Sequence, residues 1–255
     1  MKKFSMKYKK NLISIITVVF NGEKYLEKAI KSILNQTYNK FELIIIDGGS
    51  TDGTLNIIKK YKRSIKYWVS EKDDGIYDAM NKGIKKANGD IIGILNSDDT
   101  YRKNALKIVN NYFTKNKKIK FLFGSVKKDR ILNGFYPNDI SWKFNIYPAH
   151  SSGFFIKKIV HKRIGLYNSK FKFSADYDLF YRLIVKHKLY GVCTKFTEVT
   201  GNFRLDGLSS RVSIYNKMLE EFKIRIHNNQ NKILVISLCL IKFFYYWLCK
   251  IKTKF

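Results

Sequence analysis

Two adjacent carboxylates follow a short apolar run near the middle of the chain. Ile91–Leu95 is almost wholly apolar and is bounded by turn residues, which is typical of a strand buried on both faces. Asn96–Asp99 follows at once. Ligands of open α/β sheets bind beyond the carboxyl ends of strands, so this pair predicts a magnesium or manganese site shared with phosphate oxygens. The alternative is a polar loop in which Asp98 or Asp99 caps a helix starting near Arg102.

A second candidate binding segment is the turn Asp47–Thr54, with the sequence DGGSTDGT, directly after the apolar run Phe41–Ile46. Glycines let the backbone approach a ligand closely, and Ser50, Thr51 or Asp52 can cap the helix that follows. A strand end, a glycine-rich turn and a helix N-terminus together favour phosphate or nucleotide binding. The dinucleotide fingerprint and the P-loop lysine pattern are both absent from the sequence, so an ordinary strand–turn–helix connection stays open.

A third pair of carboxylates, Asp176 and Asp178, lies in the first turn of a predicted helix whose apolar residues share one face. One of them could act as a general base beside a cleft. Both could instead complement the helix dipole, and the residues alone favour this interpretation because charges in first turns are routine.

The elements that must position these residues alternate between strands and helices. Apolar, β-branched runs predict four strands, over Ile13–Val19, Phe41–Ile46, Ile65–Val69 and Ile91–Leu95. Helical periodicity predicts helices between them, over Tyr25–Leu34, around Leu55–Ile58 and over Ile76–Ala87. This order implies an α/β fold with a mostly parallel, Rossmann-like sheet and helices on both faces.

The pattern loosens after Arg102. We expect a helix over Ala105–Phe113 and strands over Ile119–Val126, Ser152–Ile156 and Gly191–Val199. The segments Lys127–His150 and Gly201–Arg211 are expected to be irregular, the second as a mobile polar loop.

The composition constrains the partners and the compartment. The formal net charge is +29, from 49 basic and 20 acidic residues, which favours an anionic partner such as a lipid surface, a nucleotide or a nucleic acid, unless it reflects compositional drift. The three cysteines are not in metal-ligand spacing and indicate a reducing compartment. The basic N-terminus followed by an apolar run mimics a signal peptide, but no cleavage motif follows, so we interpret it as a solvated arm.

A long apolar stretch, Ile233–Cys249, lies near the C-terminus. As a helix it measures about 25 Å, just short of the roughly 30 Å hydrocarbon core of a bilayer. Its lysines and aromatic residues suit a headgroup boundary, so we expect a helical tail associated with an anionic membrane surface. The alternative is a terminal helix packed on the domain or on a partner subunit.

Two stretches carry a resemblance to a known family. They are ISIITVVFNGEKYLEKAIKSILNQTYNKFELIIIDGGSTDGT and SEKDDGIYDAMNKGIKKANGDIIGILNSDD. Together they resemble the family-2 glycosyltransferases, inverting enzymes with a GT-A fold, and in particular bacterial enzymes that build O-antigen or capsular polysaccharide. The resemblance is strong over residues 13–100 and weaker over residues 150–210. It implies a glycosyltransferase domain over residues 1–211, with a nucleotide-binding half (1–100) and an acceptor half (101–211), followed by the tail at 212–255.

The resemblance assigns roles to the nucleotide side of the site. Thr17, Val18 and Val19 would line the nucleotide base, Asp47 would read the uracil ring, and Asp74 would be a further nucleotide contact. The DXD-type motif of the family falls on residues 96–99, with Asn in place of the frequent first Asp. The remaining roles in this motif are a ribose or metal contact for Asp98 and a metal ligand for Asp99.

The resemblance also covers the acceptor side. SADYDLFYRL is similar to the stretch that opens an acceptor-side helix of the family, so Asp176 matches the general base, although Ala175 replaces the usual Glu. NFRLDGLSS resembles the late loop that folds over the donor, with Asp206 where Gly is common. Candidates for acceptor or donor-loop contacts are His150, Asp178 and Arg204.

The implied function is transfer of a sugar from a nucleotide-sugar, UDP-hexose or UDP-N-acetylhexosamine, to a hydroxyl of a lipid-linked saccharide in surface polysaccharide synthesis. Mn²⁺ or Mg²⁺ would be the cofactor, and the protein would act in the cytoplasm on the inner face of the cell membrane, with a homo-oligomer allowed. The alternatives are a membrane-associated scaffold without catalysis and a nucleic-acid-binding protein. Nucleic acid is the weaker partner, because the basic residues are spread and form no known motif. A sugar nucleotidyltransferase would need a glycine-rich loop with Arg after the first strand, which this sequence lacks.

Overall fold

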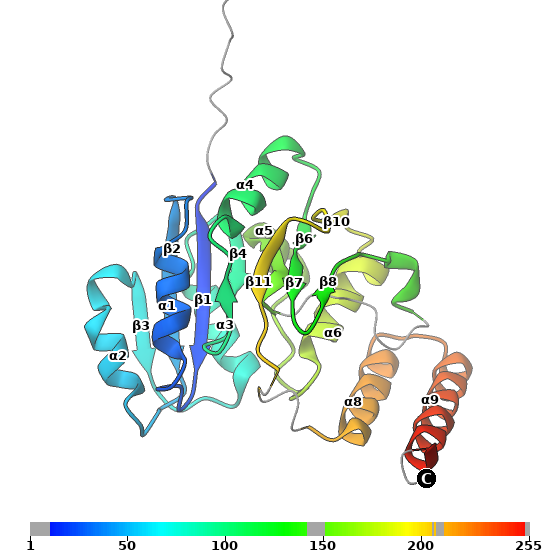
Figure 1. Cartoon of the computed structure of the whole chain (residues 1–255). Coiled ribbons are helices and arrows are strands. Elements are labelled where there is room, and N and C mark those ends of the chain that lie inside the picture. Colours follow the sequence, from blue (N-terminus) through cyan, green and yellow to red (C-terminus); the bar gives the residue numbers. More distant parts are fainter. Residues whose placement is uncertain (1–10, 142–150, 206, 208–211, 253–255) are drawn as a thin grey trace, which may run out of the picture.

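The architecture is that of a computed structural model, which describes residues 11–141, 151–205, 207 and 212–252. A seven-stranded sheet with the order β10-β6-β9-β4-β1-β2-β3 forms the centre of the molecule (Figure 1). Its strands are β1 (Ile13–Val19), β2 (Phe41–Asp47), β3 (Tyr67–Ser70), β4 (Ile91–Ile94), β6 (Phe121–Phe123), β9 (Phe154–Lys157) and β10 (Gly191–Cys193). All neighbours pair in parallel except β9, which is antiparallel to β4 and β6. The expected mostly parallel sheet is thus confirmed.

Helices cover both faces of this sheet. They are α1 (Leu26–Leu34), α2 (Thr54–Lys60), α3 (Ile76–Lys86), α4 (Ala105–Lys115), α5 (Lys158–Ile164) and α6 (Ala175–Tyr181). Successive side chains of β1 pack on opposite faces of the sheet, and both faces are buried. Ile15 packs in a core with α1 and α4, whereas Ile16 packs in a second core with α3 and α6. A strand buried on both faces has no polar side, which explains the continuous β-branched sequence.

A smaller sheet accounts for two predicted strands that the structure divides. Its order is β5-β11-β7-β8, with β5 (Thr100–Tyr101), β7 (Ser125–Lys127), β8 (Ile131–Leu132) and β11 (Val199–Asn202). The predicted strand Ile119–Val126 breaks at Gly124 into β6 and β7. A Cβ at Gly124 would lie 2.3 Å from Oγ1 of Thr200, so only glycine lets the chain cross there. The predicted strand Gly191–Val199 likewise divides into β10 and β11.

The capping interpretation of the two central carboxylates is wrong. The strand β5 follows Asp99 directly, and α4 begins only at Ala105, after Asn104 at its N-cap. Asp98 and Asp99 therefore do not serve as helix caps. The N-cap of α2 is Gly53 rather than Ser50, Thr51 or Asp52, but Oδ1 of Asp52 accepts a hydrogen bond from the backbone N–H of Thr54, the first residue of the helix.

A pair of helices follows the sheets, α8 (Ile214–His227) and α9 (Lys232–Lys252), and they lie side by side (Figure 1). Glu221 of α8 joins them, because its carboxylate pairs with Lys242 of α9 and with Arg225. The expected helical tail is present. Within the described part of the chain, no helix combines the length and the apolar character needed to cross a membrane.

One buried histidine makes the stability of this fold depend on pH. His161 of α5 is almost fully buried, with Nδ1 3.3 Å from the carbonyl oxygen of Gly165. Burial lowers the pKa of its imidazole to about 4. The folded protein therefore keeps His161 neutral at pH values where the unfolded chain, with a His pKa near 6.5, binds a proton.

We expect this difference to cost about 2 kcal/mol of unfolding free energy between pH 7 and pH 5. The unfolding free energy decreases as the pH falls, because the pKa of His161 is lower in the folded protein than in the unfolded chain. The variant His161→Gln should show a correspondingly weaker pH dependence, since its amide does not titrate. Urea unfolding of both proteins at the two pH values measures the difference. Parallel pH profiles would contradict the assignment.

Candidate functional site

The carboxyl ends of β1, β2 and β4 meet at one edge of the large sheet. The parallel register pairs Val19 with Asp47 and Ile16 with Ile94, so the segments that follow these strands emerge together (Figure 1). A Cβ added at Gly22 would lie only 3.4 Å from the hydroxyl of Ser97. The turn after β1 and the Asn96–Asp99 segment after β4 are therefore direct neighbours.

Asp47 organises the glycine-rich turn after β2. Its carboxylate is buried and accepts hydrogen bonds from the backbone N–H and the hydroxyl of Ser50 and from the hydroxyl of Ser70. Both oxygens are thus engaged in joining the turn to the end of β3. The predicted contact of Asp47 with a uracil ring stays a prediction.

The turn after β1 is fastened to the same glycine-rich segment. Asn21, with a φ of 49°, adopts the left-handed conformation that asparagine tolerates better than most residues. Its backbone N–H donates to the hydroxyl of Ser50 at 2.7 Å, and its Oδ1 accepts from the backbone N–H of Thr51 at 2.9 Å. Gly22 donates to Oγ1 of Thr54 at 2.8 Å. These contacts hold the two turns as one surface.

A carboxylate that the sequence reasoning missed lies on this surface. A Cβ at Gly48 would lie 2.5 Å from Oδ2 of Asp73, so the Asp73 carboxylate occupies the space that a side chain at position 48 would fill. Phe20 lies next to it, with its ring 63% exposed. The sequence signal for this carboxylate is the Asp73-Asp74 pair, in which the resemblance assigns a role only to Asp74.

The other residues predicted to contact the nucleotide lie around this edge. Asp74 is exposed and lines a pocket of about 160 Å³ with Tyr77 and Lys172. Thr17 and Val19 are buried in β1, and Oγ1 of Thr17 receives no hydrogen bond from the described residues.

Asp98 and Asp99 are closed in by the segment after β11. The backbone N–H of Arg204 donates to Oδ1 of Asp99 at 3.0 Å, and the guanidinium Nη1 lies 3.8 Å from Oδ2 of Asp98. The same guanidinium stacks 3.8 Å above the ring of Tyr25. The structure thus brings Arg204, predicted only as an acceptor or donor-loop contact, to the carboxylate pair across more than a hundred residues of chain.

The oxygens around Asp99 fit a divalent cation. Asp99 is 1% exposed, and among the described residues nothing donates a hydrogen bond of good geometry to its Oδ2 or to Oδ1 of Asn96. Burial, helped by the charge of Asp98, raises the pKa of Asp99 to about 7 against the hydrogen bond from the Arg204 backbone and the effect of the nearby Ser152 hydroxyl. Buried oxygens without partners are unusual, and a bound ion would satisfy them.

These protein groups do not complete a metal site alone. The described residues contain no group of three or more His, Cys, Asp or Glu side chains that could hold an ion. Asp99 and Asp98 could hold Mg²⁺ or Mn²⁺ when ligand oxygens supply the remaining positions, as phosphate groups commonly do.

Asp176 lies in the first turn of α6. Its Oδ1 accepts hydrogen bonds from the hydroxyl of Tyr77 at 3.2 Å and from the backbone N–H of Tyr177 at 2.9 Å. Burial raises the pKa of the Asp176 carboxyl above its usual range. Tyr77 also lines the pocket with Asp74, so Asp176 is hydrogen-bonded to a residue of the pocket wall without lining the pocket itself. A carboxylate with a raised pKa near a pocket suits a general base.

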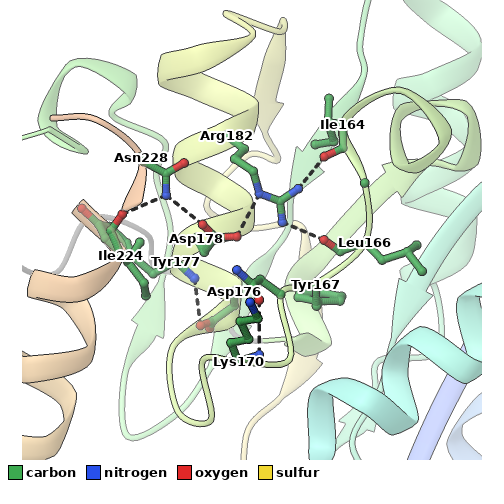
Figure 2. Close-up of polar contacts among 12 residues, drawn as sticks. Ile164, Leu166, Tyr167, Lys170, Asp176, Tyr177, Asp178, Arg182, Ile224 and Asn228 are labelled. Atoms are coloured by element: carbon green, nitrogen blue, oxygen red, sulfur yellow. Dashed lines mark hydrogen bonds and ion pairs between the residues drawn. The ribbon is translucent and has the colours of Figure 1, made fainter. Parts of the chain in front are cut away.

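Asp178 is engaged elsewhere. Its Oδ2 accepts from Nε of Arg182 at 2.8 Å, and its Oδ1 accepts from Nδ2 of Asn228 at 2.8 Å, in a buried cluster (Figure 2). With both oxygens occupied in the protein, Asp178 links α6 to α8. His150 and Asp206 lie outside the described residues.

Comparison with known proteins identifies the class of this fold and site. Residues 14–180 match the model of "Glycosyl transferase family 2". An uncharacterised glycosyltransferase of Rickettsia typhi is 32% identical over 193 residues, which cover 70% of this chain and 60% of the relative. A putative teichuronic acid biosynthesis glycosyltransferase of Bacillus subtilis is 36% identical over 101 residues, which cover 38% of this chain and 40% of the relative.

Two solved structures share the fold. TarS of S. aureus in complex with UDP-GlcNAc superposes with a TM-score of 0.65 at 16% identity, covering 89% of this chain and 70% of that chain. A mannosyltransferase of Pyrobaculum calidifontis in complex with GDP-Man and Mn²⁺ gives a TM-score of 0.66 at 15% identity, covering 92% and 69%. The GT-A-type α/β fold expected from the sequence is therefore confirmed. The chain belongs to glycosyl transferase family 2.

The network around Asp47 generates a stability prediction. In Asp47→Asn, an amide group would face donors where the carboxylate now accepts three hydrogen bonds. We expect a loss of about 1–3 kcal/mol in unfolding free energy. The control Asp74→Asn, at an exposed position, should stay within about 0.5 kcal/mol of the wild type. Urea denaturation measures both, and equal stability of the two variants would argue against the network.

Proposed function

We propose that the protein transfers a hexose or N-acetylhexosamine from a UDP-sugar to a hydroxyl of a lipid-linked saccharide, with inversion at the anomeric carbon. The observation that carries this proposal is the buried carboxylate of Asp99 after β4, whose Oδ2 meets no well-aligned donor among the described residues and whose Oδ1 accepts from the backbone of Arg204. Family membership and neighbours that bind UDP-GlcNAc or GDP-Man support a nucleotide-sugar donor. The relative named for teichuronic acid biosynthesis supports a polysaccharide product.

On the nucleotide side, the turns after β1 and β2 would receive the base and ribose. Thr17, Val19, Asp47 and Asp74 are the proposed contacts, and the exposed ring of Phe20 offers a stacking surface between them. The net charge of +29 favours the approach of an anionic donor.

On the reacting side, each group has a distinct task. Asp176 would accept the proton of the acceptor hydroxyl as that oxygen attacks the anomeric carbon, and the Tyr77 hydroxyl would orient the carboxylate. Arg204 would lie against the diphosphate that departs. Asp99 and Asp98 would hold Mn²⁺ or Mg²⁺, which supplies charge stabilisation for the leaving diphosphate when bound.

The apolar tail would place this reaction at the inner face of the cell membrane. The sequence of α9 contains no acidic residue and exposes many large apolar side chains: Ile233, Leu234, Ile236, Leu240, Ile241, Phe243, Phe244, Tyr245 and Trp247. Apolar patches of this kind mark membrane or protein interaction sites. An apolar helix face with lysines in the same helix suits peripheral binding to anionic lipid.

The donor test uses a panel of UDP-sugars with Mn²⁺, with Mg²⁺ and with EDTA, and it measures released UDP. We expect metal-dependent release from one donor. Asp99→Asn should lower this rate at least about a hundredfold, because it removes the carboxylate that would hold the ion. The matched control is Asp90→Asn, an exposed residue at the opposite end of β4, which should retain the wild-type rate. Silence across the panel together with no UDP binding by calorimetry would favour the scaffold alternative.

The membrane test is co-sedimentation with vesicles of phosphatidylglycerol and phosphatidylcholine, compared with vesicles of phosphatidylcholine alone. We expect preferential binding to the anionic vesicles. The double variant Leu240→Glu, Phe244→Glu places charges on one exposed face of α9 and should weaken binding at least about tenfold. Ile159→Glu, equally exposed on α5, should bind like the wild type. Unchanged binding of the double variant would contradict this proposal.

A further inference from the structure

The helix α8 makes hydrogen bonds to the chain on both sides of Asp176. The first contact precedes α6. Oε1 of Glu220 accepts from the backbone N–H of Lys172 at 2.5 Å, and Oε2 accepts from that of Phe173 at 2.7 Å. A buried carboxylate that accepts two backbone hydrogen bonds makes strong, charge-assisted contacts. Glu220 therefore fixes the direction in which the chain enters α6.

The second contact involves Asp178, in the first turn of α6, and is shown in Figure 2. Nδ2 of Asn228 donates to Oδ1 of Asp178, whose Oδ2 accepts from Nε of Arg182. The Arg182 guanidinium then donates to the carbonyl oxygens of Ile164 at 2.6 Å and of Leu166 at 2.7 Å. Asp178 is 1% exposed, so this chain of hydrogen bonds lies in the interior. A buried network of this kind resists rearrangement, because breaking one link leaves a buried charge without its partner.

Helix geometry transmits this restraint to Asp176. Residues two apart on a helix point about 200° from one another. When Asp178 is held toward α8 and Arg182, Asp176 must face the opposite side of α6. That side is where the Tyr77 hydroxyl donates to its Oδ1. The two contacts of α8 thus determine both where α6 begins and how it is rotated about its axis.

We propose that Glu220 and Asn228 are positioning residues, which hold the carboxylate of Asp176 in the direction needed to accept a proton. This inference rests on the proposed role of Asp176 as the general base. It gives the first helix of the C-terminal pair a part in the reaction although it supplies no reacting group.

The test compares neighbouring carboxylates on one helix. Glu220→Ala should lower kcat about tenfold or more with the best donor of the UDP-sugar panel, while the Kd for UDP stays within twofold. Glu220→Gln should recover part of kcat, since its amide oxygen still accepts one of the two hydrogen bonds while its NH2 group faces the other donor. The matched control is Glu221→Ala, which breaks the ion pairs with Arg225 and Lys242 but touches nothing before α6 among the contacts described. It should lose stability and keep kcat.

A second measurement requires no substrate. Hydrogen exchange followed by mass spectrometry should show faster exchange of the peptide covering residues 170–178 in Glu220→Ala and in Asn228→Ala, and unchanged exchange there in Glu221→Ala. Equal exchange and equal kcat in Glu220→Ala and Glu221→Ala would overturn the proposal. Asp176→Asn separates the two claims. If it retains full kcat, Asp176 is not the base, and the positioning proposal fails with it; if it loses kcat while Glu220→Ala does not, only the positioning proposal fails.

Discussion

The parallel pairing of β1 with β2 and β4 is the constraint on which the site depends. Each strand is buried on both faces, so a slip of one residue would exchange its two core faces and is strongly disfavoured. The fixed register brings the glycine-rich turn, the segment Asn21–Gly22 and the carboxylate pair Asp98–Asp99 to a common edge. Because strand pairing already brings the turns together, the hydrogen bonds between them require only small movements of the backbone.

Local sequence patterns predict this first half well, because its elements are long apolar runs with short turns. The nucleotide-side edge and the carboxylate pair follow from strand ends alone. The second half could not be predicted in the same way. Gly124 breaks a strand because Thr200 approaches it, and no local pattern reports a contact between residues so distant in sequence. The helix α5 and the antiparallel direction of β9 were missed for the same reason, since packing partners decide them.

The candidate site shows the same division. Asp99 is recognisable from its place after a strand, but its closure by Arg204 joins residues 105 positions apart. By sequence pattern, Asp178 is an acidic residue in the first turn of a helix. In the structure, Asp178 instead accepts a hydrogen bond from Asn228, fifty residues later. Helical periodicity does not predict this contact. Asp73 reaches the space above Gly48 only because the two loops fold against each other. Side chains at one edge can thus be predicted, whereas their partners from other elements cannot.

The two C-terminal helices combine an exposed apolar face with the contacts that orient α6. The helix α9 exposes an apolar face, and α8 carries the contacts that orient α6. Glu221 binds both Arg225 within α8 and Lys242 of α9, so the two helices are tied together by charges that are largely shielded from water. A force applied to α9 by a surface would therefore reach α8 through buried ion pairs, and α8 lies directly against the entry to α6. In the proposed mechanism, the placement of Asp176 as the base and the attachment of the tail to a membrane would therefore both depend on α8.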